Sequence, residues 1–211
     1  YFEEGSFLYE LYNQQDYHLN KDFRHNNPAQ PIPKQVRKHA VRFRFIGAKN
    51  ASSIINHGIK EHYYNYIIDR QRIDNVRPSS SIIYKDIYPG VDYEIFAKDE
   101  VKYQWRIEQP TISRLNQIKV AIDGATQINI KEGNLEVKTS CGTISEQAPY
   151  AYQLIDGQRT EVKCRFNVLG NILNYKFLED VNPQHPLVID PKLIFSTYSG
   201  SVGDNFGFTA T

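Results

Sequence analysis

The sequence predicts an all-β protein with a predominantly antiparallel, β-sandwich-like architecture and only short helical turns. Fifteen Tyr and 11 Phe occur among its 211 residues, and aromatic side chains fit the half-buried surface of a pleated sheet well. Segments in which apolar and polar residues alternate recur along the chain, which is the pattern of strands with one buried face. Turn-forming pairs separate most of these segments; examples are Pro89-Gly90, Asp123-Gly124 and Gly133-Asn134.

The clearest single strand is Val41 to Phe45, where strict alternation places Val41, Phe43 and Phe45 on one face. Similar patterns predict strands at Tyr63 to Ile68, Val91 to Phe96, Val101 to Ile107, Ile118 to Ile122, Gln127 to Ile130 and Leu135 to Thr139.

A meander of three consecutive antiparallel strands is predicted over Tyr150 to Leu178, because Asp156-Gly157 and Gly170-Asn171 interrupt alternating runs at hairpin spacing. Short turns of helix are expected around Asp69 to Val76 and around Thr111 to Asn116.

Breaks in the pattern divide the chain. We expect an N-terminal β subdomain over residues 1–109, with a loop over about residues 17–38 where two Pro-containing stretches end the alternation. A C-terminal β-meander subdomain is expected over 110–192, and residues 193–211, rich in Gly, Ser, Thr and Phe, are expected to start a β-repeat array. The sequence contains no Met, so we expect an internal or processed segment of a longer protein.

Composition excludes several classes of partner and site. Lys plus Arg number 25 against 24 Asp plus Glu, a balance that predicts no nucleic-acid partner. No stretch approaches the roughly 18 apolar residues of a membrane-spanning helix, so no transmembrane segment is expected in this fragment. The two cysteines lack CxxC spacing and predict no zinc site. A disulfide between Cys141 and Cys164 and two separate buried thiols are both open.

Motifs for catalysis are incomplete. The segment from His57 to His62 is one residue longer than the H-x-x-E-H zinc motif, and the segment from Ser199 to Gly203 lacks the first Gly of a nucleophile elbow. Asp92 and Glu94 share a strand face, an arrangement that any exposed strand produces. The sequence therefore predicts a protein that is not an enzyme, with no catalytic residue, no cofactor and no metal site.

Two sets of residues are candidates for ligand binding. Tyr63, Tyr64 and Tyr66 form a stacking surface for sugars or peptides if their rings are exposed. Arg37, Lys38 and Arg42 lie between Phe23 and Lys60, a segment with eight positive charges and no acidic residue. This basic segment is either a patch for an anionic ligand or a solvated face that is neutralised locally.

Several phrases, in the same order along the chain, resemble a conserved domain that precedes SBBP-type, β-propeller-related repeats in large bacterial surface proteins. The longest phrase is Ile83-Tyr84-Lys85-Asp86-Ile87-Tyr88-Pro89-Gly90-Val91-Asp92. The others are Arg42 to Ala48, Tyr64 to Ile68, Lys102 to Ile107, Ala148 to Gln153, Pro186 to Pro191, and Phe195 to Gly207, which is similar to the opening of a first repeat.

The resemblance implies a secreted or cell-surface protein, similar to Bacteroidetes proteins associated with type IX secretion or gliding motility. It implies that the downstream repeats of the same chain are a partner, with secretion or outer-membrane surface proteins or polysaccharide as others. The first hypothesis is therefore a non-enzymatic module that orders or caps the downstream repeats and contributes to surface assembly or adhesion. The alternative is a polysaccharide- or protein-binding adhesin module that uses the tyrosines and the basic segment.

Overall fold

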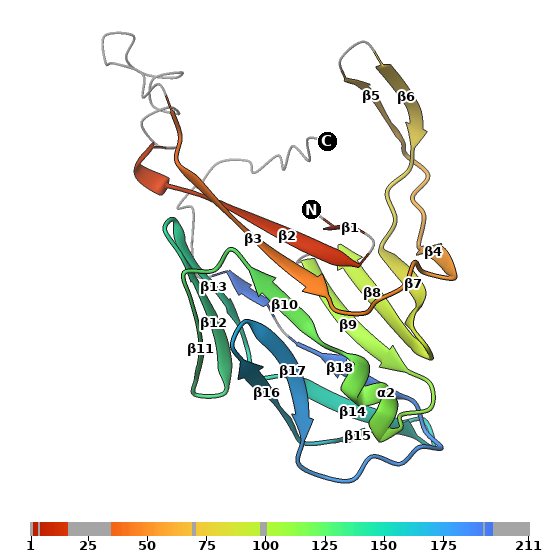
Figure 1. Ribbon diagram of the computed structural model, residues 1–211. Helices are drawn as coiled ribbons and strands as arrows, with labels where there is room; N and C mark the ends of the chain where they lie inside the picture. The colour runs from red at the N-terminus through yellow and green to blue at the C-terminus, as the bar shows by residue number, and fades with distance from the viewer. Residues whose placement is uncertain are drawn as a thin grey trace, which may run out of the picture.

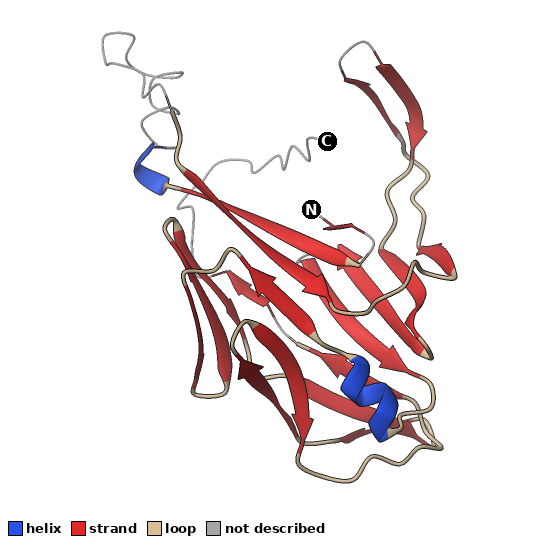
Figure 2. Cartoon of the chain, in the orientation of Figure 1, coloured by secondary structure: helices blue, strands red, loops and turns tan. Residues whose placement is uncertain are grey.

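The computed structural model describes residues 2–3, 5–16, 35–68, 71–97, 101–191 and 193–195. Strands dominate this part of the chain (Figure 2), and the helical segments are a single turn at residues 14–16 and α2 (Ile112–Gln117). Every strand pair among the described residues is antiparallel. The prediction of an all-β, antiparallel fold is confirmed.

Two large sheets and two small ones make up the fold (Figure 1). The six-stranded sheet contains, in spatial order, β1 (Phe2–Glu3), β2 (Ser6–Tyr12), β3 (Lys38–Phe45), β10 (Val120–Asp123), β17 (Ile172–Phe177) and β16 (Cys164–Leu169). The seven-stranded sheet contains β15 (Gln158–Glu161), β14 (Tyr150–Ile155), β18 (Leu187–Asp190), β9 (Val101–Ile107), β8 (Val91–Ala97), β7 (Ser81–Tyr88) and β4 (Ser53–His57). The small sheets are β11 (Gln127–Lys131), β12 (Asn134–Thr139), β13 (Gly142–Glu146) and β19 (Leu193–Phe195), and the pair β5 (Tyr64–Ile68) and β6 (Gln71–Val76).

The two large sheets pack against each other through aromatic rings. Phe45 of β3 lies with its ring centroid 4.8 Å from that of Trp105 on β9, and Phe7 of β2 lies 5.3 Å from Tyr103 on β9. Trp105 is completely buried, and its Nε1 donates a hydrogen bond of 3.2 Å to the Tyr175 hydroxyl of β17. The four-stranded sheet adds apolar side chains to the same core. One aromatic core therefore joins three sheets.

The strand predicted from alternation at Val41 to Phe45 is confirmed within β3. Val41 and Phe43 are completely buried, whereas Arg44 is exposed. The expected boundary between residues 109 and 110 does not divide the fold, because both large sheets combine strands from the two sides of it. Sheet pairing is non-local, so a break in sequence pattern does not separate structural units.

The predicted three-stranded meander is wrong in one respect. Both hairpins form at the predicted turns, β14 with β15 and β16 with β17, but β15 and β16 belong to different sheets. The chain crosses between the sheets at Val162, which is buried and whose N–H donates to the Ala151 carbonyl at 2.9 Å. The first hairpin adds Ala151 of β14 to the core, and the second adds Phe166, Leu173 and Tyr175 from the opposite sheet.

Of the two expected helical turns, one is confirmed. Helix α2 begins after Thr111, whose hydroxyl accepts a hydrogen bond from the Arg114 N–H at 3.3 Å and so caps the helix. Residues 71–76 form strand β6 instead, because they pair with β5. Cross-strand pairing overrides the local preference of this short polar segment.

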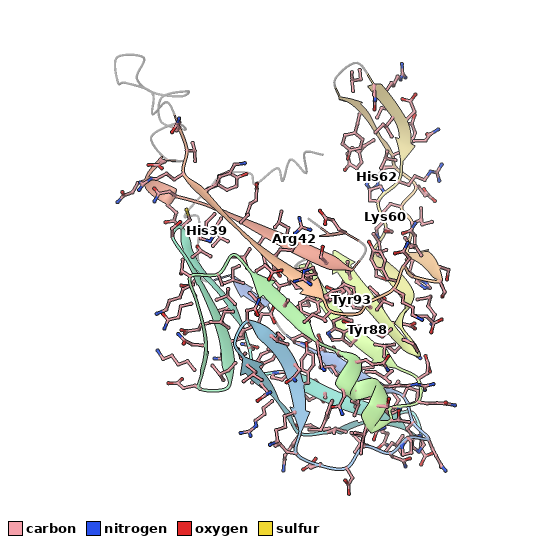
Figure 3. All side chains as sticks on the ribbon, viewed as in Figure 1. His39, Arg42, Lys60, His62, Tyr88 and Tyr93 are labelled. Carbon is pink, nitrogen blue, oxygen red and sulfur yellow. The ribbon has the colours of Figure 1, made fainter. Side chains whose placement is uncertain are left out.

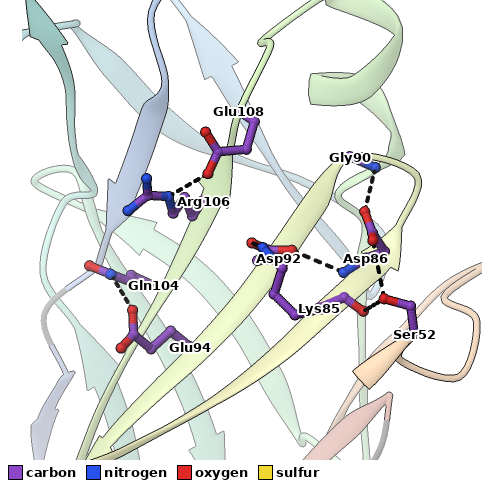
Figure 4. A network of polar contacts seen from close by, with 9 residues as sticks. All are labelled: Ser52, Lys85, Asp86, Gly90, Asp92, Glu94, Gln104, Arg106 and Glu108. Atoms are coloured by element: carbon purple, nitrogen blue, oxygen red, sulfur yellow. Dashed lines mark hydrogen bonds and ion pairs between the residues drawn. The ribbon is translucent and has the colours of Figure 1, made fainter. Parts of the chain in front are cut away.

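Ile83 to Asp92, the longest motif of the family resemblance, forms the irregular turn between β7 and β8 (Figure 4). The register shifts between Tyr84 and Tyr88, and Asp86 has φ +52°, a left-handed conformation that Asp tolerates. Buried Asp92 accepts the Asp86 N–H at 2.9 Å and pairs with Lys85. The Asp86 carboxylate in turn accepts the Gly90 N–H at 3.3 Å. These residues therefore have a structural role that accounts for their pattern.

We expect Asp92→Ala to lower the free energy of unfolding by about 2–4 kcal/mol, because it removes the buried acceptor of the Asp86 N–H and leaves Lys85 unpaired. Urea denaturation of the full chain measures this change. Glu108→Ala is the matched control: it deletes the carboxylate of the exposed Arg106–Glu108 pair and is expected to cost less than about 1 kcal/mol. Equal losses in the two variants would contradict the structural role of Asp92.

Candidate functional site

Strands β5 and β6 form an arm that stands away from the two packed sheets (Figure 1). Within the described chain these two strands pair with each other, and all six residues of β6 are exposed. Tyr63 and Tyr64 are each 53% exposed. A two-stranded ribbon without a core beneath it has marginal stability in water, and the exposed side chains of the arm lie in solvent.

One face of the arm is apolar and aromatic. His62, Tyr64 and Tyr66 alternate along the chain, with ring centroids 5.6 Å apart for the first pair and 6.4 Å for the second. Ile73 lies opposite Tyr66 and Val76 lies opposite Tyr64, and both aliphatic side chains are exposed. These five residues are called the arm face. It contains two of the three tyrosines predicted for binding, and Tyr63 precedes the strand on the alternate side.

The basic residues of the prediction lie elsewhere, on β3 and just before it (Figure 3, where Arg42 and His62 mark the two places). Each has an acidic partner near the N-terminal strands, and hydrogen bonds from the guanidinium groups hold the pKa values of Glu3 and Asp16 below their usual range. The pairs are Arg37 with Asp16, Lys38 with Glu10, and Arg42 with Glu3. The positive charge at these three positions is therefore locally neutralised, and the structure does not join them with the tyrosines into one site.

Both cysteines are free thiols, so the disulfide alternative is not the one that the structure contains. The Cys141 Sγ lies 3.8 Å from the Arg37 carbonyl, and the Cys164 Sγ lies 3.6 Å from the Pro149 carbonyl. Burial raises the pKa of Cys164 to about 11, with a further contribution from Glu161. Cys164 is therefore a protonated, weakly reactive thiol at neutral pH.

The incomplete catalytic motifs of the sequence either make structural hydrogen bonds or lie outside the described residues. Glu94 accepts hydrogen bonds of 2.8 Å from Ser81 and from Gln104, so its carboxylate is held within the sheet. Residues 17–34 and 199–203 are outside the described chain. In the part that is described, no group of three His, Cys, Asp or Glu side chains is placed to hold a metal ion. No helix there is long and apolar enough to cross a membrane.

A histidine clamp ties the four-stranded sheet to β3. The Ser140 N–H donates to His39 Nδ1 at 3.2 Å, so Nε2 carries the proton and donates to the Gly124 carbonyl at 2.6 Å. The Ser140 hydroxyl lies 2.9 Å from the same Nδ1. Although Ser beside His is also the start of a catalytic pair, the backbone donor already occupies this nitrogen. These hydrogen bonds hold β3 against the turns at Gly124 and Ser140, which is a structural role.

The most unusual group is Glu146 of β13, which the sequence analysis missed. Its side chain is completely buried, and the Tyr103 hydroxyl donates to its Oε2 at 2.8 Å. Among the described residues, Glu146 Oε1 and the buried hydroxyl of Tyr93 have no hydrogen-bond partner. A sequence signal existed: Ile144 and Glu146 are two residues apart on one strand, so the carboxylate occupies an inward, apolar position.

Burial raises the pKa of Glu146 to about 7, an effect that the hydrogen bond from Tyr103 reduces. Burial also raises the pKa values of Tyr9, Tyr93 and Tyr103, with a further increase from the nearby Glu146 charge. Carboxyl groups with such values often serve as general acids. Here the side chain has no exposed surface, so no substrate reaches it in this conformation, and we expect its titration to act on the stability of the fold.

Residues 1–192 match a family described as a domain of unknown function, DUF7948. The chain belongs to this family. No curated protein and no solved structure matches the chain. The DUF7948 domain thus includes both large sheets, the arm and Glu146, whereas β19 begins at residue 193, just beyond the matched residues.

The stability of the DUF7948 domain is expected to depend on pH through Glu146. Because its folded pKa of about 7 exceeds the unfolded value of 4.5, its neutral form contributes stability that is complete below pH 4.5 and is lost as pH rises to about 7. The unfolding free energy of Glu146→Gln relative to the parent chain should therefore increase by about 3 kcal/mol across this range. Urea denaturation at pH 4.5, 6 and 7.5 measures the difference.

The matched control is Glu132→Gln, which removes an exposed carboxylate from the turn between β11 and β12. It accounts for the general effect of deleting one negative charge. A Glu146→Gln profile that runs parallel to the parent and to this control would contradict the assignment.

Proposed function

We propose that this domain is a non-enzymatic extracellular module of a large exported surface protein. It orders or caps a β-repeat array that follows it in the chain, and so contributes to surface assembly or adhesion. The proposal places the protein in a secreted or cell-surface location and takes the downstream repeats as its first partner.

The observation that carries the proposal is the pairing of β19 with β13. Leu193 lies opposite Glu146, and Phe195 lies opposite Ile144 in an antiparallel register. The chain that leaves the DUF7948 domain therefore adds a strand to one of the domain's own sheets. Without this strand, β13 would present a row of unpaired backbone groups, and an open edge of this kind is a template for pairing.

The preceding strand supports the same reading. β18 lies within the seven-stranded sheet between β14 and β9, and Leu187 and Ile189 are completely buried. The chain is thus fixed in the core immediately before it reaches β19. Repeat arrays need protected ends because each repeat buries its apolar face against a neighbour, and an exit that is held by two sheets provides a rigid start.

If the domain caps the array, the chain extended through the following repeats should unfold in one cooperative thermal transition, measured by calorimetry. Ile194→Pro places a residue without an N–H in the middle of β19 and is expected to split this transition into two. Arg159→Pro, in the exposed edge strand β15, is the control: it lowers stability while leaving a single transition. Two independent transitions in the unaltered extended chain would refute capping.

A second candidate function, an adhesin module that binds polysaccharide or protein, is favoured by the arm face. The exposed ring of Tyr64 and the half-buried ring of Tyr66 are suited to stacking, and the aliphatic side chains opposite them add apolar area. The basic residues support it less, since Arg37, Lys38 and Arg42 already have acidic partners.

For this adhesin function we expect saturable binding of the full chain to a polysaccharide panel or to bacterial envelopes. The double variant Tyr64→Ala with Tyr66→Ala should weaken it roughly tenfold or more, at about 0.5–1.5 kcal/mol for each ring contact. Tyr63→Ala, on the alternate side, is the matched control and should have a smaller effect. Loss of binding in Arg42→Ala at low salt would instead assign recognition to the basic segment, and absence of any binding would eliminate this second candidate.

A further inference from the structure

Glu146 links the exit strand to the core. It is the last residue of β13, and its Cα partner in the neighbouring strand is Leu193, the first residue of β19. Its backbone thus lies in the ladder that holds the outgoing chain. Its side chain, by contrast, points into the interior of the protein, where it is completely buried.

The described titratable groups around this carboxyl come from four strands of the two large sheets. They are Tyr9 on β2, Tyr93 on β8, Tyr103 on β9 and Tyr175 on β17, while Leu135 lies opposite on β12. All are neutral tyrosines or aliphatic. Within the described residues, the single hydrogen bond to the carboxyl is that of Tyr103, and the second oxygen has no partner.

Loss of the proton to solvent would leave a negative charge in this enclosure with one donor. Such a charge is strongly disfavoured in an apolar interior, and contact with water would relieve this cost. These five strands form longer ladders with their neighbours. β19, which pairs with the backbone of Glu146, is an edge strand held by three residue pairs. Short edge elements open at the lowest free energy.

We propose that Glu146 is a proton-operated latch for the exit strand: with a neutral carboxyl β19 stays paired with β13, and ionisation of the carboxyl opens this pairing to water. The regulatory role of this latch rests on the proposed capping function, because release of β19 would loosen the start of the repeat array. The raised pKa of Glu146 brings this transition into the range between mildly acidic and neutral pH.

Amide hydrogen exchange at residues 193–195 of the full chain, corrected for intrinsic rates, tests the latch between pH 5 and pH 8. The opening constant of β19 should rise by up to about tenfold per pH unit from pH 5 to 7 and then level off. Amides of β17 in the core should not show this rise. In Glu146→Gln, whose side chain stays neutral, the β19 opening constant should be independent of pH.

A second variant tests the same device without removing the carboxyl. Tyr103→Phe deletes the hydrogen bond that favours the ionised form, so the pH at which the rise levels off should move upward. Tyr88→Phe is the matched control, because the Tyr88 hydroxyl donates to the Lys119 carbonyl at 3.2 Å rather than to Glu146. It should leave that pH unchanged.

Each contrary result identifies what has failed. Protected β19 amides whose pH dependence is the same in the parent and in Glu146→Gln would overturn the latch and leave capping intact. A parallel rise in β17 would also overturn it, since the effect would then be global unfolding. Unprotected β19 amides at every pH in all variants would overturn the latch together with the strand addition on which the capping proposal depends.

Discussion

The fold depends on the contact between two antiparallel sheets around Trp105. This side chain is completely buried, with Phe45 of the opposite sheet 4.8 Å away between ring centroids and a hydrogen bond to the Tyr175 hydroxyl. The three residues come from positions far apart in the chain, so the core forms only when both halves are present. Such non-local pairing delays folding, because loop closure must precede the contacts that reward it. It also explains why, among the described residues, both large sheets combine strands from the two halves of the chain.

Among the described residues, the two buried carboxylates show how differently one fold can treat a charge. Asp92 has Lys85 and the Asp86 N–H as partners, so its charge is compensated and its removal is costly. Glu146 has one hydroxyl donor, and its other oxygen has no partner among the described residues. Natural cores rarely leave such a group unsatisfied. A buried polar group that lacks a hydrogen-bond partner, without a visible structural gain, is found more often at functional sites.

The sequence predicts what depends on neighbouring residues and misses what depends on pairing at a distance. Alternation identified the buried face of β3, and Thr111 marked the start of α2. The turn at Gly170-Asn171 correctly indicated a hairpin, but a turn does not specify which sheet its strands join, and so the predicted meander was wrong. Residues 71–76 became a strand through pairing with β5.

The same distinction applies to the candidate site. The acid-free segment looked strongly basic because the acidic partners lie outside it: Asp16, Glu10 and Glu3 precede Arg37, Lys38 and Arg42 by 21, 28 and 39 residues. Position in the sequence could not show that the arm face is exposed, since alternation alone assigns half of the tyrosines to the core. Glu146 stood at an inward position beside Ile144, and an acidic residue in that register was the available signal.

Function is expected where a β protein leaves sheet edges or apolar faces without a neighbour, because these are the places where further chain is bound most readily. Among the described residues two places stand out: the arm face, which is largely exposed, and the edge of β13, which would be open without the outgoing strand β19. They differ in kind. The arm face offers side chains, so it is suited to a separate partner and its loss should leave folding intact. The β13 edge offers backbone groups and is occupied by the protein's own outgoing chain, with a titratable group directly beneath it. Variants at the two places should therefore separate adhesion from capping, because in the described part of the chain β5 and β6 pair only with each other.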